Sequence, residues 1–400
     1  MSVSRIGVLG AGTMGGGIAQ VAALGGLITS LYDPDPEALE SGGIRIGEDL
    51  AKGESHGRWS EADSEAALDR LDRLTSDLEE LAGCELVIEA APERLELKRD
   101  LFVELADILG PEAVLATNTS SLRVAEIAAG VPQPERVVGM HFFNPPALMK
   151  LVEVVATERS SEPALAAATK VAERMGRTPI RARDSVGFVA NRLARPFTLE
   201  SLRMLADGVA EAPAIDRIVR LGGGFRMGPF ELLDLIGLDV NLEIARSFFL
   251  QGGEPERWRP SPIQEKLVAE GRLGRKSGRG YYLYGEGHER EIDPELGILA
   301  PTLDPEKLAR IDPRAEEVLT RLFAQIANEA AFALEEEIAS PQDMETAMQL
   351  GFNWPAGPLR FAKLIGPARA VALLERLERG QGAAYRPAPR LQAEAEEAAG

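Results

Sequence analysis

The strongest constraint on the fold of this chain lies near its start, where an apolar run leads directly into a glycine-rich turn. Residues 5–9 (Arg-Ile-Gly-Val-Leu) are typical of a buried strand, and Gly10-Ala11-Gly12-Thr13-Met14-Gly15 follows at once. Residues 15–23 then read as a helix. This order of strand, tight turn and helix is the context in which the pattern G-x-G-x-x-G binds a dinucleotide.

Each part of this loop has a physical role. Gly10 allows the turn, Gly12 lets the backbone approach a pyrophosphate, and Gly15 lets the helix pack close to the strand. The helix N-terminus, with Thr13 and Met14, offers N–H groups and a positive dipole end to the phosphates. The next strand (27–32) ends at Asp33, where an acid about 20 residues after the glycines is expected to bind the ribose 2′-hydroxyl. Because Asp33 would repel a 2′-phosphate, NAD is favoured over NADP.

Strands and helices continue to alternate through the first half of the chain. Residues 84–90 and 113–117 are apolar runs, and residues 93–108 between them have helical periodicity. This alternation predicts a Rossmann-type, doubly wound parallel sheet. Ligands bind beyond the carboxyl ends of such strands. Asn118 and Ser120 directly follow one of those ends and are therefore candidate site residues, although turn and helix-cap chemistry is an alternative role for this stretch.

A histidine and a glutamate form the candidate catalytic pair. His141, one of three histidines, ends a β-like run (137–140) and precedes an Asn-Pro-Pro turn, and Glu153 lies in the next β-like run, 151–155. An imidazole at a strand end and a carboxylate on the following strand are able to meet as a base and the group that orients it. The alternative is a core histidine satisfied by a backbone carbonyl, with Glu153 unrelated to it.

From Gly187 onward helical patterns dominate, and one helical unit occurs twice. Residues 318–366 match 189–237 without a gap, and Asn191 of the first copy aligns with Thr320 of the second. We expect a nucleotide-binding domain (1–186), a first helical domain (187–284), a linker (285–312) and a degenerate, structural second copy (313–400). The tail after about residue 380 is expected to be frayed.

Composition excludes several classes of function. The formal net charge is −19, so no basic footprint for nucleic acid or an anionic membrane is expected. Cys84 is the only cysteine, which excludes an intrachain disulfide and a cysteine metal cluster, and no metal site is predicted. We find no signal peptide and no apolar run long enough to span a bilayer. A cytoplasmic enzyme is therefore expected.

Five blocks together resemble the L-3-hydroxyacyl-CoA dehydrogenase family. They are residues 10–15, Asn118-Thr119-Ser120-Ser121, His141-Phe142-Phe143-Asn144-Pro145, Gly187-Phe188-Val189-Ala190-Asn191-Arg192 and Met227-Gly228-Pro229-Phe230-Glu231. The resemblance runs in order from residue 5 to about 284, and the repeated unit is similar to the dehydrogenase part of multifunctional fatty-acid oxidation proteins. In the family, the helix after the second strand is rich in lysines that meet the CoA phosphates. Residues 44–58 lack such a set, so no residue is assigned to CoA.

The resemblance implies reversible, NAD-dependent oxidation of a 3-hydroxyacyl-CoA. It implies that His141 is the general base, that Glu153 holds its imidazole, that Ser120 hydrogen-bonds the reacting oxygen and that Asn191 binds near the substrate carbonyl. It also implies that Glu93, Lys98 and Asn118 contact the cofactor. Histidine suits the proton transfer because its pKa lies near working pH, and NAD carries the hydride chemistry.

Two other functions and one question of assembly stay open. The same scaffold also suits a dehydrogenase of a free 3-hydroxy acid or sugar acid, or an NAD-binding protein without catalysis. Family members with one helical unit dimerise through it, so we expect the second copy to pack on the first as a pseudo-dimer. Whether the full chain also forms a homodimer is left open.

Overall fold

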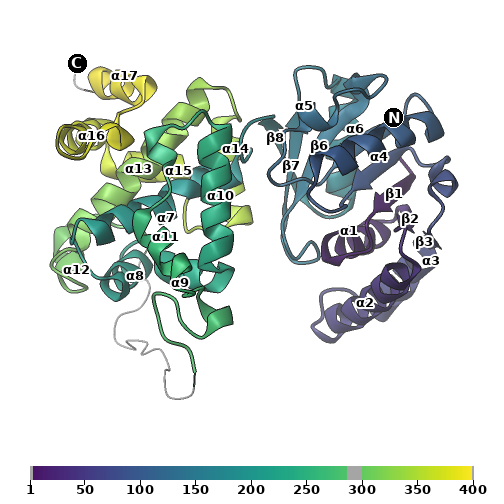
Figure 1. Cartoon of the computed structure of the whole chain (residues 1–400), viewed down its shortest axis with the longest axis horizontal. Coiled ribbons are helices and arrows are strands. Elements are labelled where there is room, and N and C mark those ends of the chain that lie inside the picture. Colours follow the sequence, from purple (N-terminus) through teal and green to yellow (C-terminus); the bar gives the residue numbers. More distant parts are fainter. Residues whose placement is uncertain (1–2, 286–299, 399–400) are drawn as a thin grey trace. The chain divides into compact units, whose positions relative to one another are not determined.

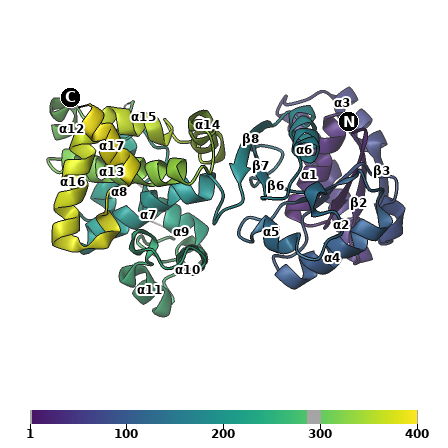
Figure 2. The ribbon, with the colours of Figure 1, turned by 90° about the horizontal axis from the view of Figure 1, so that it is seen from above.

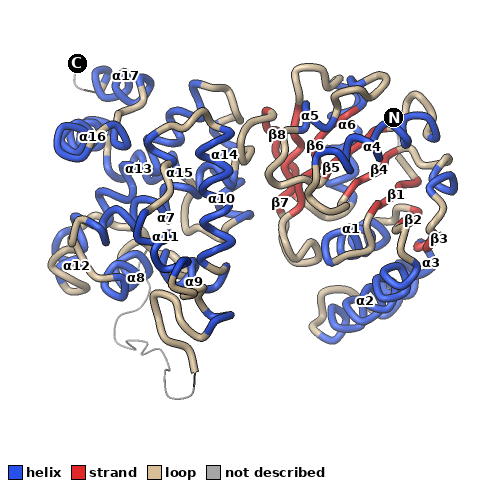
Figure 3. Tube along the Cα trace, in the orientation of Figure 1, coloured by secondary structure: helices blue, strands red, loops and turns tan. Residues whose placement is uncertain are grey.

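The protein folds into two compact units, Met1–Phe188 and Val189–Gly400, which are described separately (Figure 1). The structure is a computed structural model and describes residues 3–285 and 300–398. Among these residues the strands all lie in the first unit, and the second is built of helices (Figure 3). No helix in the described part of the chain has the length and apolar character needed to cross a membrane.

The first unit is an eight-stranded sheet in the order β3-β2-β1-β4-β5-β6-β7-β8. β4, β5 and β6 are buried along their whole length, as expected for apolar strands covered by helices on both faces (Figure 2). The strands are β1 (Arg5–Leu9), β2 (Ile28–Tyr32), β3 (Leu71–Thr75), β4 (Leu86–Glu89), β5 (Val114–Thr117), β6 (Val137–Phe142), β7 (Leu151–Ala156) and β8 (Thr178–Arg183). The helices are α1 (Thr13–Leu24), α2 (Pro36–Ser55), α3 (Glu61–Arg70), α4 (Leu95–Ile108), α5 (Val124–Ile127) and α6 (Glu162–Arg174).

One strand pair departs from the expected parallel sheet. β6 and β7 pair antiparallel, whereas the other neighbouring strands pair in parallel. The reason is the connection between them: residues 143–150 are too few for the crossover that parallel neighbours need, so the chain returns as a hairpin. The reversal also places His141 inside β6 rather than at its end.

The second unit contains the same succession of helices twice. α7 (Ala190–Ala206), α8 (Ala212–Leu221), α9 (Pro229–Ile236) and α10 (Leu238–Gln251) align with four later helices in the gapless register of the sequence match. Those helices are α13 (Ala315–Glu335), α14 (Pro341–Gly351), α15 (Pro358–Ile365) and α16 (Pro367–Gln381). α11 (Pro262–Ala269) likewise has a counterpart in α17 (Pro389–Glu397), and α12 (Pro305–Ala309) lies between the two sets.

Aligned residues of the two sets also make equivalent contacts. The Asp216 carboxylate accepts the backbone N–H groups of Phe230 and Glu231 at the start of α9. Its counterpart Glu345 accepts those of Leu359 and Arg360 at the start of α15, which are the aligned positions. In both sets a carboxylate thus satisfies the free N–H groups at a helix N-terminus.

Buried ion pairs join the two sets of helices reciprocally. Arg192 of α7 pairs with Glu329 of α13 at 2.8 Å, and the aligned Arg321 of α13 pairs with Glu200 of α7 at 2.8 Å. Each arginine also forms a second ion pair with an acid at the C-terminal end of the opposite helix. Glu336 pairs with Arg192, and the aligned Asp207 pairs with Arg321. Such an exchange, in which each partner offers the same residues, is the geometry of a two-fold interface.

The tail is folded as far as α17, which ends at Glu397, so the expectation of a frayed tail is wrong. Tyr385 is buried and its hydroxyl accepts a hydrogen bond from Arg321 at 2.7 Å. Leu391 of α17 is also buried, and the Ala388 N–H donates to the Asn328 side chain. The tail is otherwise rich in polar residues and alanine, so its composition did not indicate that these few side chains are buried. In the expected linker, residues 286–299 lie outside the described residues, whereas α12 follows with Leu308 buried.

The folded tail leads to a prediction about stability. A chain ending at Gln381 loses Tyr385 and Leu391, and removing one such core side chain typically costs about 2–5 kcal/mol. We expect Tm to fall by about 10 °C or more. A chain ending at Glu397 is the control and should melt like the full protein. Equal melting temperatures of the two truncations by calorimetry would show that the tail contributes nothing.

Candidate active site

The glycine loop joins β1 to α1 and leaves open space above the helix N-terminus. Gly10 has φ +97°, and a Cβ on it would lie 2.7 Å from the Ala90 carbonyl oxygen. A Cβ on Gly15 would lie 1.7 Å from the Gly10 oxygen, so this approach of helix to loop requires glycine. A Cβ on Gly12 would meet nothing within 4 Å. The loop therefore fits a pyrophosphate against the first N–H groups of α1, which begins at Thr13 and Met14.

Asp33 lies beside this loop at the end of β2. The parallel pairing of β1 and β2 brings them together, since the Gly10 N–H donates to the Tyr32 carbonyl at 2.8 Å. One carboxylate oxygen of Asp33 accepts the Ala11 N–H at 2.8 Å and the other accepts the Asp35 N–H at 3.0 Å. Asp33 thus orders the glycine loop, a role that the sequence pattern alone did not indicate.

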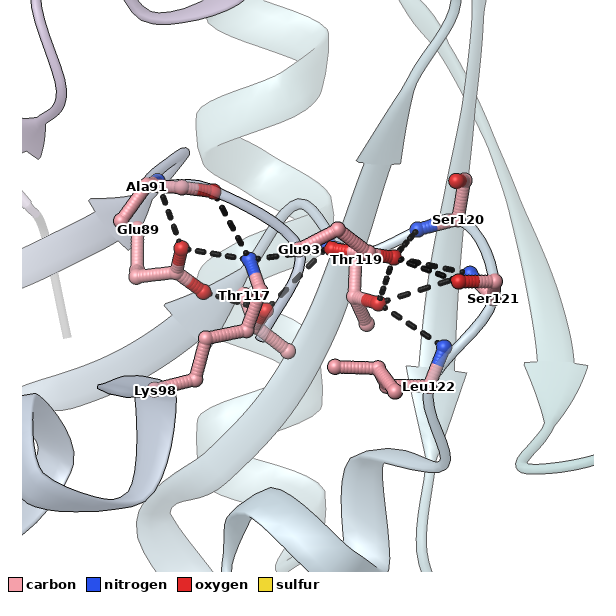
Figure 4. Close-up of polar contacts among 9 residues, drawn as sticks. All are labelled: Glu89, Ala91, Glu93, Lys98, Thr117, Thr119, Ser120, Ser121 and Leu122. Atoms are coloured by element: carbon pink, nitrogen blue, oxygen red, sulfur yellow. Dashed lines mark hydrogen bonds and ion pairs between the residues drawn. The ribbon is translucent and has the colours of Figure 1, made fainter. Parts of the chain in front are cut away.

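A buried lysine connects two acids at the end of β4 (Figure 4). The Lys98 ammonium lies 2.6 Å from a Glu89 oxygen, 3.2 Å from the Ala91 carbonyl and 3.2 Å from a Glu93 oxygen. These three acceptors match its three N–H groups. Glu89 also accepts the Thr117 hydroxyl at 2.7 Å. The sequence analysis did not predict Glu89 and Thr117 as site residues. A glutamate inside an apolar strand is the feature that could have indicated Glu89.

Glu93 holds the turn that follows β5. One of its oxygens accepts the hydroxyl of Thr119 at 2.6 Å and the N–H groups of Ser120 and Ser121 at 3.1 Å. Burial raises the pKa of Glu93, but Lys98 and the hydroxyl hydrogen bonds outweigh it, so the net pKa is lowered. Ser121 also directs its hydroxyl to Glu93, whereas the Ser120 side chain points away from the cluster (Figure 4). The turn is therefore rigid while the Ser120 hydroxyl faces outward.

His141 and Glu153 meet across the antiparallel strands. They are directly paired in the register of β6 and β7, and the His141 Nδ1 lies 2.6 Å from a Glu153 carboxylate oxygen. Both side chains are buried. The rings of Phe143 and Phe188 lie 4.6 Å and 5.8 Å from the imidazole. If Nδ1 carries the proton that Glu153 accepts, Nε2 is the basic nitrogen.

The predicted residues of the first unit gather at one edge of the sheet. The Asn118 amide oxygen accepts the Phe142 N–H at 2.8 Å, which ties the turn after β5 to the residue next to His141. The glycine loop, Glu93, Asn118 and Ser120 all follow carboxyl ends of neighbouring parallel strands. Asn191 belongs to the second unit, in the first turn of α7. Its counterpart Thr320 accepts a hydrogen bond from Arg369 at 3.3 Å.

Comparison with known families matches both units. The family model described as 3-hydroxyacyl-CoA dehydrogenase, NAD binding domain, matches residues 5–185. The model described as 3-hydroxyacyl-CoA dehydrogenase, C-terminal domain, matches residues 187–284 and again residues 318–398.

Similar proteins bear related names. The chain is 37% identical to the 3-hydroxyadipyl-CoA dehydrogenase of Escherichia coli K12, over 97% of this chain and 96% of that protein. It is 43% identical to a probable 3-hydroxybutyryl-CoA dehydrogenase of Deinococcus radiodurans, over 70% of this chain and 100% of that protein. The crystal structure of 3-hydroxybutyryl-CoA dehydrogenase from Escherichia coli K12 has a TM-score of 0.89 and 34% identity, over 99% of both chains.

The fold and the site thus define an NAD-dependent oxidoreductase that acts on a CH–OH group. The chain belongs to the 3-hydroxyacyl-CoA dehydrogenase family.

Proposed function

We propose that His141 is the general base in the reversible oxidation of an (S)-3-hydroxyacyl-CoA to the 3-ketoacyl-CoA. The observation that carries this proposal is the 2.6 Å contact between Nδ1 of His141 and Glu153 at the edge that bears the glycine loop. His141 Nε2 takes the proton of the substrate 3-hydroxyl. Glu153 fixes the imidazole and offsets the positive charge that develops on it. Bound NAD supplies the hydride acceptor.

Ser120 and Asn191, one in each unit, are the other residues for which we propose substrate contacts. The Ser120 hydroxyl points away from the Glu93 cluster, so it is available to hydrogen-bond the reacting oxygen. Glu93 supports that role by holding the Ser120 backbone. Asn191, at the start of α7, supplies an amide near the substrate carbonyl. In the second helical set Thr320 takes this position, and we assign no chemistry to it.

The cofactor contacts are proposed at the same edge. The proposed pyrophosphate cradle consists of Gly10, Gly12, Thr13, Met14 and Gly15. Asp33 binds the ribose, and Glu93 and Asn118 line the cofactor side of the β4 and β5 turns. Lys98 acts here through its neighbours, since its ammonium already has three protein acceptors. It holds the Glu89 and Glu93 carboxylates in place.

The helical sets are proposed to form a pseudo-dimer within one chain. The support is the reciprocity of the pairs Arg192–Glu329 and Arg321–Glu200, which join aligned residues. In that arrangement residues 313–398 occupy the place of a second subunit's helical domain.

Relatives of this chain are named for two kinds of acyl group. One relative is named for a 3-hydroxyadipyl group, which carries a second carboxylate, and another for the short, uncharged 3-hydroxybutyryl group. Both names fit the 3-hydroxyacyl-CoA class.

Replacing the proposed base tests the mechanism. His141→Ala should lower kcat by about 10²–10⁴ while NAD binding, followed by NADH fluorescence, is retained. Glu153→Gln keeps a hydrogen-bond partner but removes the charge, so its kcat should fall less. Undiminished turnover of a 3-ketoacyl-CoA by the His141→Ala protein would rule out the base assignment.

The ribose role of Asp33 predicts a change in coenzyme preference. Asp33→Asn retains an oxygen for the Ala11 N–H, so the loop should persist, but the charge that repels a 2′-phosphate is lost. The ratio of kcat/KM for NADH over NADPH should fall by roughly tenfold or more, since one desolvated charge contact is worth about 1.5–3 kcal/mol. An unchanged ratio would remove Asp33 from the ribose site.

A shortened chain tests the pseudo-dimer. A chain ending at residue 284 exposes the apolar face of α7 and leaves buried Arg192 without Glu329, so it should self-associate. Sedimentation should report a dimer or larger species. Adding Arg192→Glu places like charge opposite Glu200 of a second copy and should weaken that association. A stable, soluble monomer at residue 284 would contradict the arrangement.

A further inference from the structure

An arginine in α7 is buried with no acid paired to it in the part of the chain that the structure describes. Arg195 is 8% exposed, and its Nε and Nη1 make no hydrogen bond within the described residues. The guanidinium lies over the ring of Phe248 from α10, 5.1 Å from its centroid. Burial alone lowers the pKa of Arg195 to about 10, which leaves it charged at neutral pH. A buried charge in this state is costly and marks a position where something further is expected to bind.

The same helix shows how an arginine is neutralised when its role is structural. Arg192, one turn earlier, has the carboxylates of Glu329 and Glu336 within 2.8 Å. Arg195 has no such pair among the described residues, although it is nearly as buried. Both arginines are buried, and they differ in that only Arg192 has carboxylates beside it among the described residues.

The second helical set provides an internal comparison. Ala324 aligns with Arg195 and Leu377 aligns with Phe248, and both are buried. The second set therefore has small and aliphatic side chains at these two positions. Arg195 is a feature of the first set, the one that carries Asn191.

Arg195 and Asn191 share one face of α7. Residues four apart in a helix are neighbours, about 6 Å apart along the axis. We propose that Arg195 binds the distal carboxylate of a dicarboxylic 3-hydroxyacyl-CoA, which makes it the specificity residue for the acyl tail. This inference rests on the proposed role of Asn191 beside the substrate carbonyl.

The chemistry of the pair fits such a tail. In a six-carbon dicarboxylic acyl group the terminal carboxylate lies three carbons beyond C3, a reach similar to one helical turn. A guanidinium offers two parallel N–H donors to a carboxylate. Phe248 covers one face of the guanidinium and excludes water, which strengthens the contact. A tail that ends in a methyl group leaves the cation unpaired.

Two substrates of equal length test the proposal. We would measure kcat/KM of the full-length enzyme with (S)-3-hydroxyadipyl-CoA and with (S)-3-hydroxyhexanoyl-CoA, which differ only at the tail end. Arg195→Met should lower the value for the adipyl substrate by roughly tenfold to a hundredfold, mainly through KM. The value for the hexanoyl substrate should stay the same or rise. Arg195→Lys should restore part of the loss.

Other outcomes overturn the inference. An equal loss with both substrates would mean that Arg195 binds the CoA phosphates or supports the fold, and a matching fall in Tm would identify the latter. Arg246→Met, an exposed arginine of α10, is the control and should change neither substrate. A wild-type enzyme inactive with both substrates would refute the proposed function. Activity with both and no selective effect of Arg195→Met would refute this inference alone.

Discussion

Parallel pairing of β1, β4, β5 and β6 is the constraint on which the rest of the first unit depends, because it sends the carboxyl ends of four strands to one edge. The segments after three of these strands carry the proposed site residues: the glycine loop after β1, Glu93 after β4 and Ser120 after β5. The antiparallel pair of β6 and β7 adds the proposed base from within the sheet. Because β7 returns directly beside β6, the Glu153 carboxylate is delivered opposite His141 by backbone register, without a flexible loop.

Buried charges are compensated in both units, and the compensation organises their surroundings. Lys98 links Glu89 to Glu93, and through Glu93 it orders the turn that carries Ser120. Arg192 and Arg321 each bind two acids from the opposite helical set. Removing one partner from such a group leaves an uncompensated buried charge, which costs more than the pair contributes. Arg195 differs, since no acid among the described residues pairs with it, and we propose that the substrate supplies the carboxylate.

Local patterns in the sequence predicted much of this architecture. The glycine spacing, Asp33 and the alternation of apolar runs predicted the sheet and its ligand edge, because turn chemistry and strand burial are encoded by neighbouring residues. The repeat predicted two helical sets. The reversal at β7 follows from the length of the connection between β6 and β7, which the alternation of apolar runs does not encode. The contacts of Lys98 with Glu89 depend on tertiary structure. The folded tail was missed because Tyr385 and Leu391 are isolated anchors in a polar stretch, and their burial becomes visible only in three dimensions.

The reciprocal arginine pairs bear on how the two helical sets are able to diverge in sequence during evolution. In a symmetric dimer of identical subunits every substitution at the interface appears on both sides at once. When both sides are encoded in one chain, they vary independently, and one side is released from selection for catalysis. Thr320 for Asn191 and Ala324 for Arg195 are differences of that kind, while the arginines and acids that join the sets are retained. In the proposed pseudo-dimer each chain carries one substrate site, and the second helical set has no counterpart of Asn191 or Arg195.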